Sequence, residues 1–214
     1  MGHFLNSSPA VHFHNNNSIL FDGVNDHITI AGLTNDIATG AGTVSMWIKL
    51  DATSANGAWF KASTDSNNQI AMTYINGSTV FRPTYKAGGT AESVDIAFNF
   101  EGNDTWYHVA LTWDTAAAEG AGEMKAWLSG VQSGSTQAIA GTWSGSIDTV
   151  TAGKNSLADN SYSAGHISQL TVWKTALTAA QMLQLYNSGT PGNPLMNSNV
   201  ANLVGWYGFN EGTG

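Results

Sequence analysis

The sequence predicts an all-β fold, a two-sheet antiparallel sandwich with one short helix near the C-terminus. Short apolar stretches recur between clusters of Gly, Asn, Asp and Ser, which is the signature of many antiparallel strands. Residues 43–50 and 105–114 alternate strictly, with the period of a strand that buries one face. Helical periodicity is confined to residues 178–186. One short helix among many strands argues against an α/β enzyme core.

The predicted strands follow one another at short intervals. Residues 18–21 and 27–30 flank a turn at 22–26, and Asn76-Gly77 predicts a second hairpin turn. Further strands are predicted at 43–50, 58–61, 69–75, 79–85, 93–100, 105–114, 123–130, 165–174 and 202–209.

The two clearest strands have two distinct faces. In residues 43–50, the apolar positions Val44, Met46, Ile48 and Leu50 alternate with Ser45, Trp47 and Lys49. In residues 105–114, one face carries Tyr107, Val109, Leu111 and Trp113, and the other carries Trp106, His108, Ala110 and Thr112. His108 lies in the middle of this strand, between Tyr107 and Val109.

The helix has defined ends. Thr178 and Gln181 form the pattern of a capping box, and Met182, Leu185 and Tyr186 then recur at helical spacing. Asn187-Ser188-Gly189 ends it. The segment is expected to connect strands of the sandwich.

Composition restricts the classes of partner. The formal net charge is −8, 10% of residues are charged and Cys is absent. A chain with so few cations lacks the basic stripe that neutralises a phosphate backbone, so no nucleic-acid partner is expected. Because the chain has no cysteine, disulfides and thiolate chemistry are excluded.

The first residues predict a polar arm over 1–17, with the domain proper at 18–214. This arm has neither a basic region nor a long apolar region, so no signal peptide is expected, and nothing later predicts membrane insertion. The low charge and Gly-rich surface are typical of extracellular or virion proteins, which predicts a chain made in the cytoplasm and exposed outside it.

Five stretches resemble, in the right order, motifs of laminin-G-like domains, which are concanavalin A-like jelly rolls. They cover residues 18 to 190 and read FDGVNDHITI, TVSMWIKL, WYHVALTWD, KAWLSGV and ISQLTVWKTALTAAQMLQLYNSG. The resemblance implies a jelly-roll sandwich, and it places His108 in a strand and not in a site, which predicts a structural histidine hydrogen-bonded within the sandwich.

The C-terminal NLVGWYGFNEGTG resembles the strand that opens such domains. It either closes the same sandwich or begins a second repeat. We favour closure, because Val204 and Trp206 point one way in an extended strand while Tyr207 and Phe209 point the other, and rings on both faces need burial. The natural chain is nonetheless expected to continue beyond Gly214.

Catalysis is not expected. Some members of the wider superfamily are glycoside hydrolases, which need two carboxylates roughly 5 to 10 Å apart. No two acids are two positions apart, and the hydrolase strand motif E-x-D-x-x-E is absent. The nearest acid pairs, spaced three or four residues apart, are Asp22/Asp26, Glu119/Glu123, Glu92/Asp95 and Glu101/Asp104.

No cofactor is required by this interpretation, but a structural calcium ion is one alternative. Laminin-G-like domains often hold Ca²⁺, and Asp22, Asn25 and Asp26 offer hard oxygen donors. The other reading of these residues is a tight turn. Ser168 and Gln169 stand where the family usually has two acids, which weakens the calcium reading.

Aromatic side chains near loops are candidates for stacking on sugars. Trp59, Tyr74 and Tyr85 lie in such segments, although rings of this kind more often belong to a core. We expect Trp113, Trp173 and Trp206 to be buried, with Trp59 or Trp143 as the exposed ones.

The resemblance extends to virion structural proteins of tailed phages. It implies a non-catalytic virion surface protein (capsid decoration, fibre or tail component), oligomeric, docked on other virion proteins through residues 1–17 and binding host cell-surface glycans. The alternative is a carbohydrate-binding or adhesion module of a secreted bacterial protein. A third reading, a hydrolase, requires an acid pair brought together from different strands.

Overall fold

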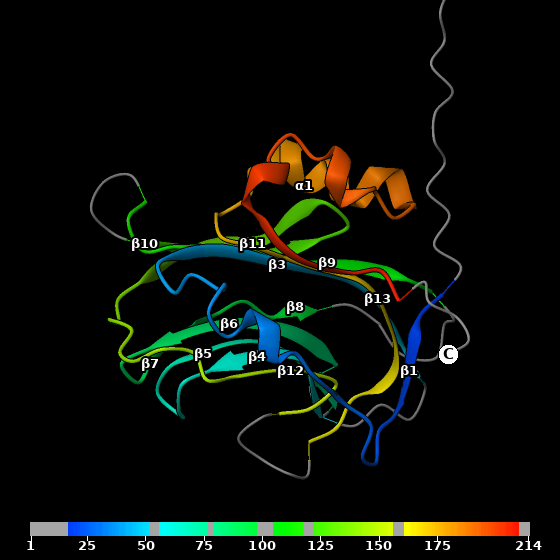
Figure 1. Ribbon diagram of the computed structural model, residues 1–214, viewed down its shortest axis with the longest axis horizontal. Helices are drawn as coiled ribbons and strands as arrows, with labels where there is room; N and C mark the ends of the chain where they lie inside the picture. Colours follow the sequence, from blue (N-terminus) through cyan, green and yellow to red (C-terminus); the bar gives the residue numbers. More distant parts are fainter. Residues whose placement is uncertain are drawn as a thin grey trace, which may run out of the picture.

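The protein is a sandwich of two antiparallel sheets, here as a computed structural model (Figure 1). The structure describes residues 17–51, 56–76, 79–97, 105–117, 122–155 and 161–209. Most of the arm predicted at 1–17 and the last residues, 210–214, lie outside the described part. The predicted fold class, an all-β jelly-roll sandwich with one short C-terminal helix, is confirmed.

Sheet A forms the upper layer in Figure 1. Its strand order is β1-β13-β3-β9-β10-β11, and β14 also pairs with β13. The bounds are β1 Ile19–Asp22, β3 Ala41–Leu50, β9 Tyr107–Asp114, β10 Gly122–Leu128, β11 Val131–Ile139, β13 Ala164–Trp173 and β14 Leu203–Tyr207.

Sheet B lies below sheet A and has the order β2-β12-β4-β5-β6-β7, with β8 also pairing with β6. The bounds are β2 Ile28–Thr29, β4 Gly57–Ser63, β5 Gln69–Ile75, β6 Val80–Ala87, β7 Thr90–Ser93, β8 Ile96–Ala97 and β12 Thr149–Ala152. A short 3-10 helix, η1 (Ala31–Leu33), follows β2.

The main core fills the space between the sheets. It takes the inward positions that the alternation in the sequence predicts, including Val44, Met46 and Ile48 of β3 and Leu111 and Trp113 of β9, all fully buried. Burial of this much apolar surface is the principal term that stabilises the sandwich.

A second, smaller cluster lies on the outer face of sheet A, beneath α1 (Ala179–Tyr186). Met182 and Leu185 of α1 pack there against Trp127 and Trp173. The predicted capping box of Thr178 is present. The 3-10 helices η3 (Asn187–Gly189), η4 (Pro194–Met196) and η5 (Val200–Asn202) complete the layer. We call residues 175–202 the cap. No helix of the described part is long and apolar enough to cross a membrane.

β14 and β1 lie end to end along β13. Leu203 and Tyr207 pair with Trp173 and Leu170, whereas β1 continues the same edge from Ile19, which pairs with Ile167. The C-terminal segment therefore occupies an edge position in this sandwich. Its residues are only partly buried, and Trp206, expected to be buried, is of intermediate exposure.

Candidate functional site

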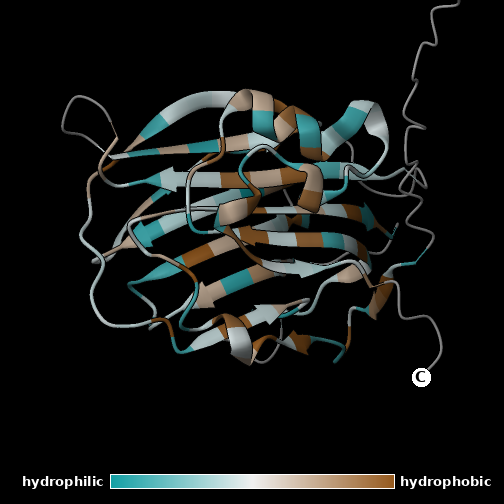
Figure 2. Cartoon of the chain, turned by 45° about the horizontal axis from the view of Figure 1, so that its top comes forward, coloured by the Kyte–Doolittle hydropathy of each residue, from teal (hydrophilic) through white to brown (hydrophobic). Residues whose placement is uncertain are grey.

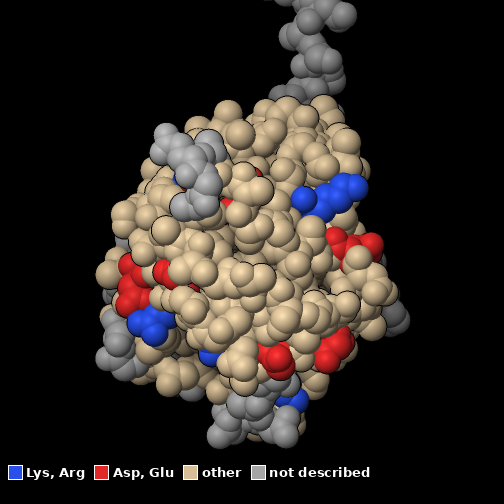
Figure 3. Space-filling view, turned by 90° about the vertical axis from the view of Figure 1, so that its left-hand side faces the viewer, with Lys and Arg blue, Asp and Glu red and all other residues tan. Residues whose placement is uncertain are grey.

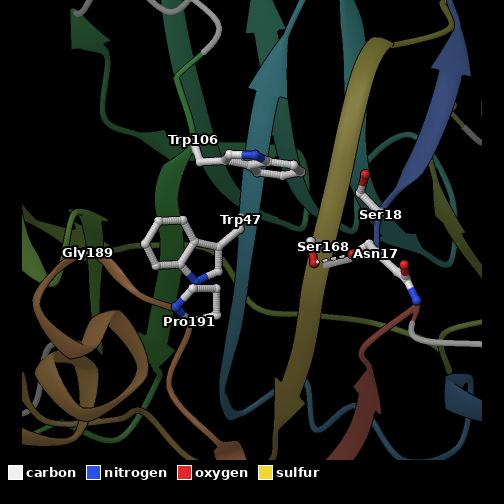
Figure 4. A pocket seen from close by; sticks show the side chains of 7 residues that line it. All are labelled: Asn17, Ser18, Trp47, Trp106, Ser168, Gly189 and Pro191. Atoms are coloured by element: carbon white, nitrogen blue, oxygen red, sulfur yellow. Dashed lines mark hydrogen bonds between the residues drawn. The ribbon is translucent and has the colours of Figure 1, made fainter. Parts of the chain in front are cut away.

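A hollow of about 170 Å³ opens on the outer face of sheet A, beside the cap (Figure 4). Two indole rings and a proline form its apolar walls, and hydroxyl and amide groups form the opposite side. It is lined by Asn17, Ser18, Trp47, Trp106, Ser168, Gly189 and Pro191. These residues come from five separate parts of the sequence.

Trp47 is fixed between the sheet and the cap. It points outward from β3 because its neighbours Met46 and Ile48 point inward. Its ring stacks on that of Tyr186 of α1, with centroids 5.9 Å apart and an interplanar angle of 17°. Only 4% of Trp47 is exposed, so it offers the hollow one edge of a rigidly held ring.

Trp106 immediately precedes β9 and is half-buried. The Lys49 ammonium lies 5.9 Å from the centroid of its ring, and the His166 ring meets it at a steep angle, 6.1 Å away. In Figure 4 the Trp106 ring lies above Trp47 and Pro191, with the hollow between them. Trp106 is thus held by neighbours while it forms a wall of the hollow.

The polar side of the hollow depends on the segment that enters β1. Ser168 Oγ donates a hydrogen bond to the Asn17 carbonyl, 3.1 Å away, and Ser18 Oγ lies 3.0 Å from His166 Nδ1. These bonds draw Asn17 and Ser18 against β13 (Figure 4). Apolar rings beside a few hydrogen-bonding groups are the usual composition of a small-molecule site.

A buried polar layer lies between sheet A and the cap, next to the hollow. His108 Nε2 and Ser45 Oγ are 2.7 Å apart, and burial lowers the pKa of His108 to about 3. His108 is therefore neutral at physiological pH and sits between Trp47 and Tyr186, with ring centroids 5.5 Å and 6.1 Å away. This matches its prediction as a structural histidine. Near it, Trp206 Nε1 donates to Gln169 Oε1 at 2.5 Å.

The predicted sugar-stacking residues Trp59, Tyr74 and Tyr85 are core residues, so that prediction is wrong. They are 1%, 0% and 0% exposed. A bulge in β4 between Ala58 and Phe60 accompanies the burial of Trp59, which packs edge-on against Phe21. Tyr85 donates its hydroxyl hydrogen to the Thr39 carbonyl at 2.8 Å, and burial raises its pKa to about 12.

Asp22, Asn25 and Asp26 form a tight turn. Asp22 Oδ1 accepts hydrogen bonds from the backbone N–H groups of Val24, at 2.8 Å, and of Asn25, at 3.2 Å. These backbone bonds lower the pKa of Asp22. Asp26 Oδ2 accepts from the Asp22 N–H at 3.2 Å. The carboxylates thus already bind their own backbone, and the described residues contain no cluster of three or more His, Cys, Asp or Glu side chains suited to a metal. The turn fits a calcium ion poorly, and calcium binding stays a prediction.

Of the acids in the nearest pairs of the sequence, Asp95 and Glu123 each form an ion pair with a basic side chain. Asp95 is bound by Arg82, with Nε–Oδ1 at 2.5 Å and Nη2–Oδ2 at 2.8 Å. Glu123 instead pairs with Lys125. Glu119, Glu101 and Asp104 lie outside the described residues.

The residues of the hollow were not predicted as a site, although the sequence carries a signal for two of them. Trp47 and Trp106 occupy the faces of their strands opposite to the apolar positions, where a large ring has no main core to enter. A tryptophan on the polar face of a strand is a better indication of a site than one next to a loop.

Comparison with known proteins identifies the fold family. The profile of the concanavalin A-like lectin/glucanases superfamily matches residues 22–182. No curated protein sequence gave a match. Among solved structures, a heptameric SAP-like pentraxin from Limulus polyphemus has 19% identity and a TM-score of 0.63, with 92% of this chain and 94% of that chain covered.

Two bacterial proteins are similar at the same level. Domain 4 of the arabinanase AbnA from Geobacillus stearothermophilus has 20% identity and a TM-score of 0.58, covering 79% of this chain and 76% of that one. NanB sialidase from Streptococcus pneumoniae has 14% identity and a TM-score of 0.62, with 83% of this chain but 28% of the sialidase covered. At these identities the likeness concerns the fold alone. From the profile match over most of its length, the chain belongs to the concanavalin A-like lectin/glucanase superfamily.

Proposed function

We propose that this protein is a non-catalytic, glycan-binding surface protein whose binding site is the hollow between Trp47 and Trp106. The observation that carries the proposal is the pairing of two indole rings with the hydroxyl and amide groups of Asn17, Ser18 and Ser168. The apolar C–H face of a pyranose stacks on an aromatic ring, and its hydroxyl groups need hydrogen-bonding partners at the rim.

The size of the hollow suggests what part of a glycan it takes. Its volume of about 170 Å³ is below the ~300 to 1,000 Å³ of pockets that enclose a drug-sized ligand. It therefore suits one sugar residue, at a chain end or a branch. A site of this size binds weakly by itself.

The comparisons agree with a sugar-binding role. The AbnA domain was solved with arabinotriose, and the binding domain of a botulinum neurotoxin, with a TM-score of 0.53, was solved in complex with SialylT. These proteins are too distant to identify the sugar for this chain.

The absence of catalysis is part of the proposal. Of the titratable groups near the hollow, His108 is buried, neutral and hydrogen-bonded to Ser45. The lining contains no carboxylate among the described residues. Glycoside hydrolysis needs two carboxylates, and the described lining of the hollow provides neither.

The test is glycan binding by Trp106 variants. Trp106→Ala should weaken the binding of any glycan found on an array at least tenfold, because it removes the partly exposed wall of the hollow, and Trp106→Phe should restore part of it. Trp143→Ala is the matched control, since Trp143 is also half-buried but packs against the main core. Equal binding by Trp106→Ala and the unchanged chain would contradict the proposal.

We further propose that the protein acts on a phage virion, as an oligomer docked on other virion proteins. The support is the resemblance of its motifs, with LYNSGTPGNP at 185–194 followed by NLVGW at 202–206, to those of tailed-phage structural proteins. Peptide mass spectrometry of purified particles tests this, and particles without the protein would leave the alternative, an adhesion module of a secreted bacterial protein.

A further inference from the structure

The cap and the strand after it form an uncharged surface. From Thr175 to Phe209 the sequence has no Asp, Glu, Lys, Arg or His, although the whole chain has a formal net charge of −8. Figure 3 shows charged side chains on the flank of the molecule, whereas the upper end, where the cap lies, has none in view. The uncharged stretch of the sequence therefore includes the whole cap and β14.

The same surface exposes large apolar side chains. Seven such residues are exposed in the described part, and four belong to the cap: Leu183 at 50%, Leu195 at 54%, Met196 at 79% and Val200 at 41%. In Figure 2 the cap comes forward, with apolar bands along its helices. A neighbouring residue of β11, Val131, is 63% exposed. Exposed apolar residues grouped in this way indicate an interaction surface.

The cap is held in shape by its own hydrogen bonds. Asn197 Nδ2 donates to the Gln181 carbonyl at 2.9 Å, and the Ser198 N–H donates to Gln184 Oε1 at 3.0 Å. These bonds tie the η4–η5 segment to α1, so Leu195 and Met196 are presented on an ordered base. A preformed surface loses less conformational entropy when it binds.

We propose that the cap is the surface through which two copies of this chain associate about a two-fold axis. A two-fold interface buries the same patch of both copies, so an excess of one charge sign in that patch makes the two copies repel each other. The cap avoids this repulsion between two strongly acidic copies because it contains no charge. Apolar groups, including an adaptable methionine, then provide the contact.

The dimer is expected to be weak. Stable interfaces use about 20 to 30 residues on each side, whereas 14 residues of the cap are exposed. We therefore expect a dissociation constant in the micromolar range and a monomer–dimer equilibrium that depends on protein concentration.

Dimerisation also brings two hollows together in one assembly. The consequence for binding rests on the proposed glycan binding. Gly189 and Pro191 belong both to the cap and to the lining of the hollow. A dimer formed through the cap therefore carries two hollows, each beside the interface. Two weak sites that engage one glycan surface together can raise the apparent affinity by about 10² to 10⁴.

Sedimentation velocity of the full chain, without glycan, tests the interface. From about 10 µM to about 1 mM the sedimentation coefficient of the unchanged protein should rise toward that of a dimer. Met196→Glu and Leu195→Glu each place two like charges in the interface and should weaken association at least tenfold. Both residues are exposed, so the fold should be unaffected.

The matched control is Val24→Glu. Val24 is 68% exposed in the turn between β1 and β2, so this variant adds the same charge outside the cap and should associate like the unchanged protein. The proposal is overturned if the unchanged protein stays monomeric up to about 1 mM, or if the cap variants dimerise normally. In either case glycan binding by single hollows is unaffected, and the two proposals can fail separately.

Discussion

His108 links the polar layer under the cap to the stability of the protein. Its ring is buried between Trp47 and Tyr186 and bonded to Ser45, so the folded protein holds it neutral, with a pKa of about 3 instead of 6.5. In the unfolded chain the same group takes up a proton below its ordinary pKa. The unfolded state therefore binds more protons than the folded state between these two values.

This difference predicts a pH dependence of unfolding. The stabilising effect of neutral His108 is complete above about pH 6.5 and decreases as the pH falls toward 3, by at most ~1.4 kcal/mol per pH unit. His108→Gln retains a hydrogen-bonding group but does not titrate. Urea unfolding at several pH values should give a shallower slope for this variant than for the unchanged protein, and identical slopes would show that His108 is not held neutral.

At the scale of elements, α1 determines the shape of the hollow without lining it. Its last residue, Tyr186, stacks on Trp47, and its capping box fixes where the helix begins. Thr178 Oγ1 accepts the Gln181 N–H, and the Thr178 N–H donates to Gln181 Oε1. Each bond satisfies a donor that the helix start would leave unpaired.

Removing the capping box at the start of α1 should therefore lower the stability of the protein and weaken glycan binding. Thr178→Ala should lower the free energy of unfolding by about 1 kcal/mol, whereas Thr178→Ser, which keeps the hydroxyl, should change it little. The Ala variant should also bind glycan more weakly than the Ser variant, because Tyr186 supports Trp47 less firmly. Equal unfolding free energies for the two variants would exclude the capping box as a stabilising element.

The strands also show which side chains could be assigned to the core or to the surface from the sequence. Alternation in β3 and β9 correctly assigned Met46 and Ile48 to the core and Trp47 to the outer face, because a strand has a fixed period of two. The bulge in β4 breaks that period, and Trp59 could not be assigned from its neighbours. Nearness to a predicted loop was a poor guide to exposure, because Tyr74 and Tyr85 are inward positions of otherwise regular strands.

At the scale of the whole molecule, the fold was predictable and the hollow was not. Five motifs in order specify the sandwich, and the superfamily profile matches most of the chain. The hollow, in contrast, joins Asn17, Trp47, Trp106, Ser168 and Pro191, which are distant in sequence. Only the strand order, with β13 between β1 and β3, brings them together, and no local pattern encodes that order.

The two proposals place glycan binding at the hollow and self-association at the uncharged cap, on adjoining parts of one sheet. Sheet A carries both, since the cap covers part of its outer face and the hollow opens beside it (Figures 1 and 4). Sheet B and the main core then support sheet A from its inner side. This division predicts that substitutions in the core act on stability, whereas those of Trp106 at the hollow and of the exposed apolar residues of the cap act on binding and association.

The most direct test of the glycan site follows the indole N–H resonances of the eight tryptophans by NMR while a glycan from the array is added. The signals of Trp106 and Trp47 should shift in a saturable manner, whereas those of the buried Trp59 and Trp113 should not. A saturable shift confined to Trp143 or Trp206 would contradict the proposed glycan site, because the sugar would then bind outside the hollow.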